Sequence, residues 1–253
     1  MSSATSIPEP PPPAPEAPKL SEPARIVNAF IAPSKTFEDI RGNASWWVPW
    51  LLAALLQVGF SFTFSQKIGW ESVIEKQWEK SPTMSARLNS MKPEQKEAAM
   101  EQGAKIAGYI GYAAPITILI YYVLAAAIAM AIFNFGFGAE VPFKSSMAVF
   151  AYSSLPLLIF WSLAIVTMYA TSSPETFNIN NPLATNPGYF LDPANSRLLY
   201  WLGSCLDVFA IWVIVLLSIG YSTITRNKVK MTSAAAVFAV IYVLMKGLGA
   251  IRA

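Results

Sequence analysis

The chain has 253 residues with a formal net charge of +3, and 54% of its residues are hydrophobic while only 13% are charged. A soluble domain normally has about a quarter of its residues charged, so this composition excludes an ordinary soluble protein. The small and dispersed positive charge also offers no electrostatic footprint for binding nucleic acid.

Residues 1–24 form a proline-rich segment without an apolar block. Such a composition predicts a disordered arm with polyproline II character. The arm is interpreted as a spacer, with docking of a partner on the proline runs as the alternative. A membrane domain is expected over residues 25–251.

Apolar residues recur at three- and four-residue spacing between Ile26 and Ile40, and Pro33 interrupts the run. The pattern predicts a broken amphipathic helix at the membrane surface, with Ser34 capping the second piece. Its basic residues are expected to face lipid headgroups: Arg25, Lys35 and Arg41. The alternative is a soluble helix packed on the loops.

Five apolar stretches are each long enough to cross a bilayer core of about 30 Å as a helix. They cover residues 46–64, 106–133, 147–170, 198–221 and 232–251. Short alternating segments typical of a β-barrel are missing. The predicted fold is therefore all-α, a polytopic helical membrane protein with five transmembrane helices and surface amphipathic helices.

A polar region, residues 65–105, separates the first two stretches. An apolar face is expected on its first helix, formed by Trp70, Val73, Ile74 and Trp78. Pro93 suits the first turn of a second helix that continues into the next stretch. The small residues on that helix repeat every four positions, which predicts close packing against another helix: Gly103, Ala107 and Gly111.

Short-loop lysines and arginines predict the orientation of a membrane protein. With the N-terminus inside, the inner side collects Lys19, Arg25, Lys35, Arg41, Lys144, Arg226, Lys228 and Lys230. Against this stands the 65–105 region, with seven basic and six acidic residues on the outer side. We expect a cytoplasmic N-terminus and an external C-terminus, and a loop at 171–197 that folds back on the outer membrane surface.

Charged residues inside a span cost about 2.5–3.5 kcal/mol on insertion scales, so each needs protein, water or a partner. The fourth stretch contains Asp207 and the fifth contains Lys246. Three interpretations compete: a structural Asp207–Lys246 pair; a snorkelling Lys246 with Asp207 hydrogen-bonded to hydroxyls such as Ser204; and a proton- or ion-carrying carboxylate. The neighbouring Cys205 is interpreted as a small packing residue.

Two segments together resemble the bacterial branch of the Yip family: FIAPSKTFEDI from Phe30 to Ile40, and LDVFAIW from Leu206 to Trp212, followed by Gly220. The resemblance implies a five-helix domain in the bacterial cytoplasmic membrane, a cytosolic N-terminus, no known catalysis, and a motif formed by Asp207, Trp212 and Gly220. Eukaryotic members bind Rab GTPases, but their Asp-Leu-Tyr-Gly-Pro motif is not found here, so that role is not carried over.

The sequence lacks the catalytic residues that known intramembrane enzymes need. The chain has no histidine, which a zinc protease or a serine–histidine dyad would need, and aspartyl chemistry would need a second buried acid besides Asp207. No cofactor or metal is expected. The sequence favours a non-enzymatic membrane scaffold, or organising factor, that lies in the lipid bilayer and acts through unidentified membrane or cytosolic protein partners, with homo-oligomers possible. The alternative is a small-solute or ion transporter that uses Asp207.

Overall fold

The computed structural model describes residues 19–79, 82–170, 177–192 and 195–252. Over these residues the regular elements are helices: α1 Glu22–Ile31, α2 Pro33–Gly42, α3 Trp47–Lys67, α4 Trp70–Glu79, α5 Pro82–Asn89, α6 Pro93–Tyr112, α7 Ala114–Phe137, α8 Phe143–Ser153, α9 Pro156–Ala170, the 3-10 helix η2 Pro187–Phe190, α10 Arg197–Cys205, α11 Val208–Ile224 and α12 Met231–Arg252. The predicted disordered arm falls largely on residues 1–18, outside the described residues.

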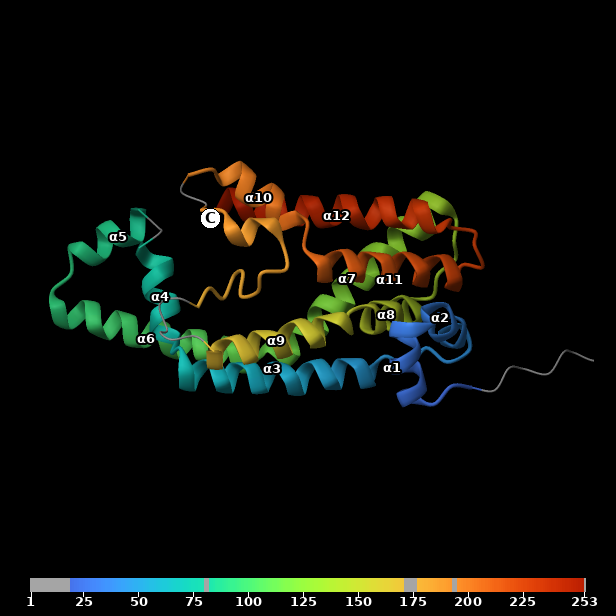
Figure 1. Ribbon diagram of the computed structural model, residues 1–253, viewed down its shortest axis with the longest axis horizontal. Helices are drawn as coiled ribbons and strands as arrows, with labels where there is room; N and C mark the ends of the chain where they lie inside the picture. The colour runs from blue at the N-terminus through green and yellow to red at the C-terminus, as the bar shows by residue number, and fades with distance from the viewer. Residues whose placement is uncertain (1–18, 80–81, 171–176, 193–194, 253) are drawn as a thin grey trace, which may run out of the picture.

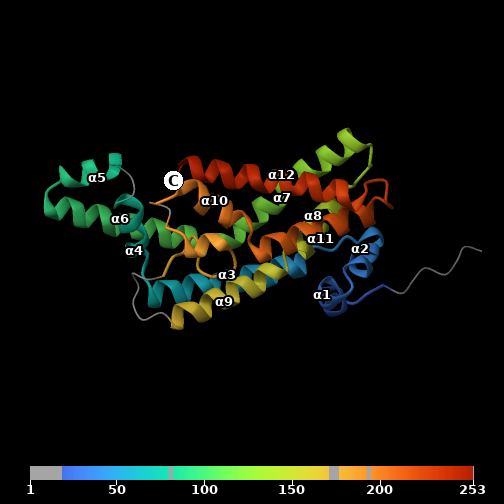
Figure 2. The same cartoon turned by 45° about the horizontal axis from the view of Figure 1, so that its top comes forward.

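The long helices lie side by side along the long axis of the molecule (Figures 1 and 2). At one end lie α1, α2, and the turns that join α7 to α8 and α11 to α12; we call this the α1–α2 end. At the opposite end lie α4, α5, α6, α10 and the C-terminus (Figure 1). The chain therefore passes repeatedly between two ends, as a multi-pass membrane protein must.

Three helical segments are long and apolar enough to cross a membrane: Trp47–Lys67, Ala114–Phe137 and Phe143–Ala170. A fourth crossing results if α10 and α11, which are bent by 45° at their junction, count as one span. The apolar part of α12, Met231–Gly247, is shorter. The protein is thus an all-α multi-pass membrane protein with three to four candidate spans, where the sequence predicted five. The predicted continuous helix over 198–221 is corrected to a broken one.

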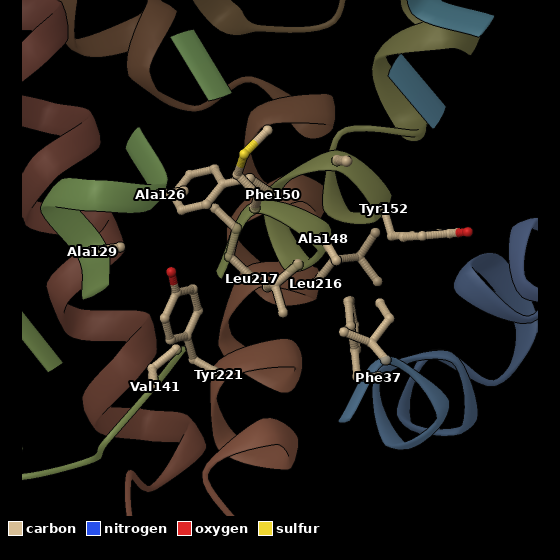
Figure 3. Packing of buried hydrophobic residues seen from close by; sticks show 14 of the residues in the cluster. Phe37, Ala126, Ala129, Val141, Ala148, Phe150, Tyr152, Leu216, Leu217 and Tyr221 are labelled. Carbon is tan, nitrogen blue, oxygen red and sulfur yellow. The ribbon is translucent and has the colours of Figure 1, made fainter. Parts of the chain in front are cut away.

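The principal core lies where α2, α7, α8 and α11 meet (Figure 3). Phe37, Val149, Tyr152 and Tyr221 are completely or almost completely buried there. Small residues on α7 and α8 allow the helices to approach closely, namely Ala126, Ala129, Ala148 and Ala151. Close van der Waals packing between helices, which small residues permit, is what stabilises a membrane bundle.

A polar contact runs through this core. Ser146 on α8 donates a hydrogen bond to the Ala126 carbonyl at 2.8 Å, which uses its single proton. The Tyr221 hydroxyl therefore donates to the Ser146 oxygen. Because all three groups lie away from water, the contact satisfies atoms that would otherwise be costly to bury.

The first two helices confirm the predicted break in an amphipathic segment but correct the roles of Ser34 and Arg25. The break occurs near Pro33 as predicted, but Ala32 is the N-cap of α2 and Ser34 lies inside its first turn without capping it. Phe37 and Arg25 are both 0% exposed, so one face of α1 and of α2 packs against the bundle, and Arg25 does not face lipid headgroups. Only Lys35 and Arg41 are exposed as expected.

The predicted packing face on α6 is confirmed, and its partner is α4. A Cβ added at Gly111 would lie 2.6 Å from the Trp70 ring, and one at Gly103 would lie 3.1 Å from Ile74. The helix begins at Pro93, as the sequence indicated. These glycines are required because the aromatic face of α4 lies directly on the α6 backbone.

Candidate functional site

The buried carboxylate of Asp207 lies at the junction between α10 and α11. Asp207 is the N-cap of α11, and its Oδ1 accepts a hydrogen bond from the Ala210 backbone N–H at 3.0 Å. Asp is a favoured N-cap residue because its oxygen satisfies an amide that has no partner inside the helix. Its negative charge also complements the positive end of the α11 dipole. Asp207 therefore caps α11 at the point where the helix pair bends.

Thr185, which is distant from Asp207 in the sequence, supplies hydrogen bonds to the backbone and side chain at the helix break. The Thr185 hydroxyl donates to Oδ2 of Asp207 at 2.5 Å, and the Thr185 carbonyl accepts from the Val208 backbone N–H at 3.1 Å. Thr185 therefore supplies both a donor and an acceptor at the point where the continuous helical ladder is lost. The sequence indicated turns in this loop but not its pairing with Asp207.

Two buried asparagines tie the same loop together. Asn186 Nδ2 donates to Asn181 Oδ1 at 2.9 Å and lies 3.4 Å from Oδ2 of Asp207. Asn181 Nδ2 in turn donates to Asn186 Oδ1 at 3.3 Å. All three side chains are 7–8% exposed. We define the Asp207 cluster as Asn181, Thr185, Asn186 and Asp207.

Two glycines allow the loop to reach the helix. A Cβ at Gly188 would lie 2.3 Å from the Ser204 hydroxyl oxygen and 2.7 Å from the Tyr200 carbonyl. A Cβ at Gly203 would lie 2.7 Å from the Gly188 nitrogen. The backbone of the loop thus rests directly on the backbone of α10, which brings the Asp207 cluster together. The part of this loop around Gly188 packs on α10, and its predicted contact with the outer membrane surface stays a prediction.

The structure does not join Asp207 to Lys246. Within the described residues these two side chains form no ion pair; Lys246 Nζ instead lies 5.9 Å from the centre of the Tyr242 ring. Tyr242 donates a hydrogen bond to the Ser204 carbonyl at 3.4 Å. Of the three interpretations of this acid, hydrogen bonding to a hydroxyl matches the geometry, although the hydroxyl belongs to Thr185 and not to Ser204.

The other two residues of the sequence motif hold α11 against the first helices. Trp212 packs edge-on against Phe30 of α1, with ring centroids 5.7 Å apart. Gly220 lies against Val149 of α8 and Phe37 of α2. Asp207, Trp212 and Gly220 therefore do not converge on one pocket. They fix three different contacts along α11.

A second buried polar cluster joins α1, α2 and α8 at the α1–α2 end. Arg25 forms ion pairs with Asp39 and with Glu22, the latter at 3.3 Å, and Glu22 also accepts a hydrogen bond from the Tyr152 hydroxyl. Burial lowers the pKa of the Arg25 guanidinium. Hydrogen bonds to Tyr152 and Asp39 raise this pKa by more than burial lowers it, so it lies above the usual value. Arg25 stays charged and is paired.

The sequence pattern does not predict this cluster, because the pattern is typical of an Arg25 that faces lipid headgroups. One local signal was present, since Glu22 precedes Arg25 by three residues and places an acid on the same helical face. The pairing with Asp39 depends on how α1 folds against α2, and helical periodicity carries no information about that angle.

Among the described residues no group of three or more His, Cys, Asp or Glu side chains is arranged to hold a metal ion. No curated protein and no solved structure matched the chain. A family model described as the Yip1 domain matches residues 27–251, which include α11 and both polar clusters apart from Glu22 and Arg25. The chain belongs to the Yip1 domain family.

Proposed function

We propose that this protein is a non-enzymatic scaffold of the bacterial cytoplasmic membrane that organises protein partners. The observation that carries the proposal is the engagement of Asp207, whose two carboxylate oxygens accept hydrogen bonds from Ala210 and Thr185. An acid used in this way stabilises a bent helix and a docked loop. Its chemistry is that of a structural cap, which suits a protein that presents fixed surfaces.

The proposed topology has five passes, with the bent α10–α11 pair and α12 as the last two. The α1–α2 end is assigned to the cytoplasm because its exposed charged residues are mainly basic, and short basic loops stay inside. These residues are Lys35, Arg41, Lys144, Arg226, Lys228 and Lys230. The exposed acids at this end include Glu38 and Glu140. The C-terminus is then external.

Large apolar side chains on α7 support contact with lipid or with another helix. Ile116, Ile120, Leu124 and Ile128 are each more than half exposed and follow one another at four-residue spacing. Such a stripe needs an apolar neighbour. Lipid fills that role around a single copy, and a second copy or a partner helix fills it in an assembly.

A transporter that uses Asp207 is the second candidate. Broken helices with polar groups at the break are typical of transporter binding sites, and the 45° bend at Asp207 has this form. The candidate requires that the carboxylate release Thr185 and Asn186 during transport. A scaffold requires that these bonds persist.

Reconstitution separates the two candidates. Purified protein would be placed in liposomes, and proton and potassium flux would be measured for the unmodified chain, Asp207→Asn and Lys246→Met. A scaffold gives the flux of protein-free liposomes in all three cases, and crosslinking in native membranes recovers the same partners for all three. Flux that only Asp207→Asn abolishes would overturn the scaffold proposal.

A further inference from the structure

A cavity of about 470 Å³ opens at the α1–α2 end, between the start of α3 and the start of α8. Its walls include Asn43, Ser45, Trp46, Trp47, Lys144 and the carboxylate-bearing Glu22. The volume lies in the range of roughly 300–1,000 Å³ that small-molecule sites occupy. Of the residues in the two polar clusters described above, Glu22 alone lines this cavity. The cavity is therefore a separate feature.

The cavity lies at the depth of lipid headgroups. Helix α3 has 21 residues, which corresponds to about 32 Å and matches a hydrocarbon core of about 30 Å. Trp47 is the first residue of α3, and Phe143, which is next to Lys144, is the first residue of the third candidate span. Residues at the ends of two spans lie where lipid phosphates lie, and tryptophan collects at this level.

The polar groups of the cavity suit an anion. Lys144 is exposed and forms no ion pair among the described residues. The hydroxyl oxygen of Ser45 is buried yet has no hydrogen-bond partner, and a buried polar atom without a partner is costly. Neither α3 nor α8 has a side-chain cap at its start, so both helices bring uncapped backbone N–H groups to this region.

Glu22 is the acidic member of the wall, and both of its carboxylate oxygens already have partners. One of its oxygens pairs with Arg25 at 3.3 Å and the other accepts from Tyr152. Because Arg25 is shared between Glu22 and Asp39, one net negative charge remains in that cluster, and the ammonium of Lys144 is the one basic group that the described residues bring to the cavity wall. Basic pockets at the cytoplasmic ends of spans bind anionic lipid headgroups by this chemistry.

We propose that this cavity binds the phosphate-bearing headgroup of an anionic phospholipid. Lys144 provides the charge, Ser45 provides a hydroxyl donor, and Trp46 and Trp47 flank the glycerol region. The inference is independent of the proposed scaffold role, since a transporter could carry the same lipid site.

The test uses the full chain purified in detergent and depleted of lipid, titrated with phosphatidylglycerol or phosphatidylcholine in mixed micelles, with bound lipid counted by native mass spectrometry. We expect phosphatidylglycerol to bind more tightly than phosphatidylcholine. A hydrogen bond to a charged group corresponds to roughly a tenfold or larger change in affinity, so Lys144→Gln should weaken phosphatidylglycerol binding by about that factor. Ser45→Ala should weaken it less, and Lys144→Arg should retain it.

Lys230→Gln is the matched control, because Lys230 is exposed at the same end but does not line the cavity. Equal losses for Lys144→Gln and Lys230→Gln would overturn the proposal and indicate general surface charge. Equal affinity for the two lipids would overturn it as well. Soluble glycerol phosphate is added as a competitor at the concentration at which phosphatidylglycerol saturates the site. If it displaces the lipid, the ligand is a free phosphate compound instead.

Discussion

Gly220 of α11 lies against Val149 of α8 so closely that a Cβ on the glycine would be 2.6 Å from Val149 Cγ1. Val149 is completely buried, and its branched side chain has few alternative rotamers. The same Cβ would lie 3.1 Å from the Phe37 ring. Gly220 is thus the point where α2 and α8 both meet α11 (Figure 3 shows Phe37 beside this helix).

Gly220→Ala should destabilise the protein. Overpacking in a filled core costs about 1–3 kcal/mol, against a gain of about 1 kcal/mol in helix propensity. The measurement is the free energy of unfolding in mixed micelles. Val149→Ala in the same chain should recover part of the loss, and Gly59→Ala, where nothing lies within 4 Å of the added atom, should cause none. Unchanged stability of Gly220→Ala would show that α8 can move aside.

Replacing the cap at the helix break should separate its hydrogen bonds from its charge. Asp207→Ala loses the bonds to Ala210 and Thr185 and should cost about 2 kcal/mol, whereas Asp207→Asn keeps an N-cap acceptor and should cost less. Thermal stability in detergent provides the comparison. The double exchange Asp207→Lys/Lys246→Asp should not restore stability, because Thr185 is the partner of Asp207. Recovery in the exchanged protein would instead support an ion pair between the two positions.

Removing the buried cation of the α1–α2 end should be more damaging. Arg25→Met leaves Asp39 and Glu22 without their shared partner, and breaking a buried ion pair costs about 3–5 kcal/mol. Arg41→Met on the exposed side of α2 is the control and should cost little. Limited proteolysis reports the effect locally, since the loss of Arg25 should expose α1 to cleavage before the spans unfold. Similar cleavage of both variants would contradict a structural role for the buried pair.

The proposed five passes predict which residues a water-soluble thiol reagent reaches. In a Cys205→Ser background, a cysteine at Lys228 should react only from the cytoplasmic side, and one at Asn195 only from the outside. A cysteine at Lys144 should behave like the one at Lys228. Labelling of intact cells before and after permeabilisation measures this. Reaction of positions 195 and 228 from the same side would show that α10 and α11 do not cross the membrane as one span, and would contradict the five passes.

The sequence predicted the elements whose signals are local. Hydropathy identified the apolar helices, Pro93 marked the start of α6, and Gly103 and Gly111 marked a packing face that α4 fills. Each of these features depends on spacing within one helix, which the chain displays directly.

Features that depend on two distant segments were not predicted. The apolar run is continuous across Asp207, so the break was missed, although an aspartate directly before an apolar run is also a typical helix start. The bond from Thr185 spans 22 positions. Arg25 was placed at the lipid surface because its partner Asp39 becomes adjacent only after α1 folds against α2.

The hydrogen bond between Val208 and the Thr185 carbonyl turns one amide into a reporter. The first amides of a helix normally have no partner and exchange with solvent rapidly, whereas this one is covered as long as the loop stays on α10. Its exchange with deuterium therefore measures how often the loop lifts away, independently of any movement of the spans. A slow Val208 amide at the start of α11 would show that the loop is held firmly on α10, and a fast one would show that the loop lifts off often.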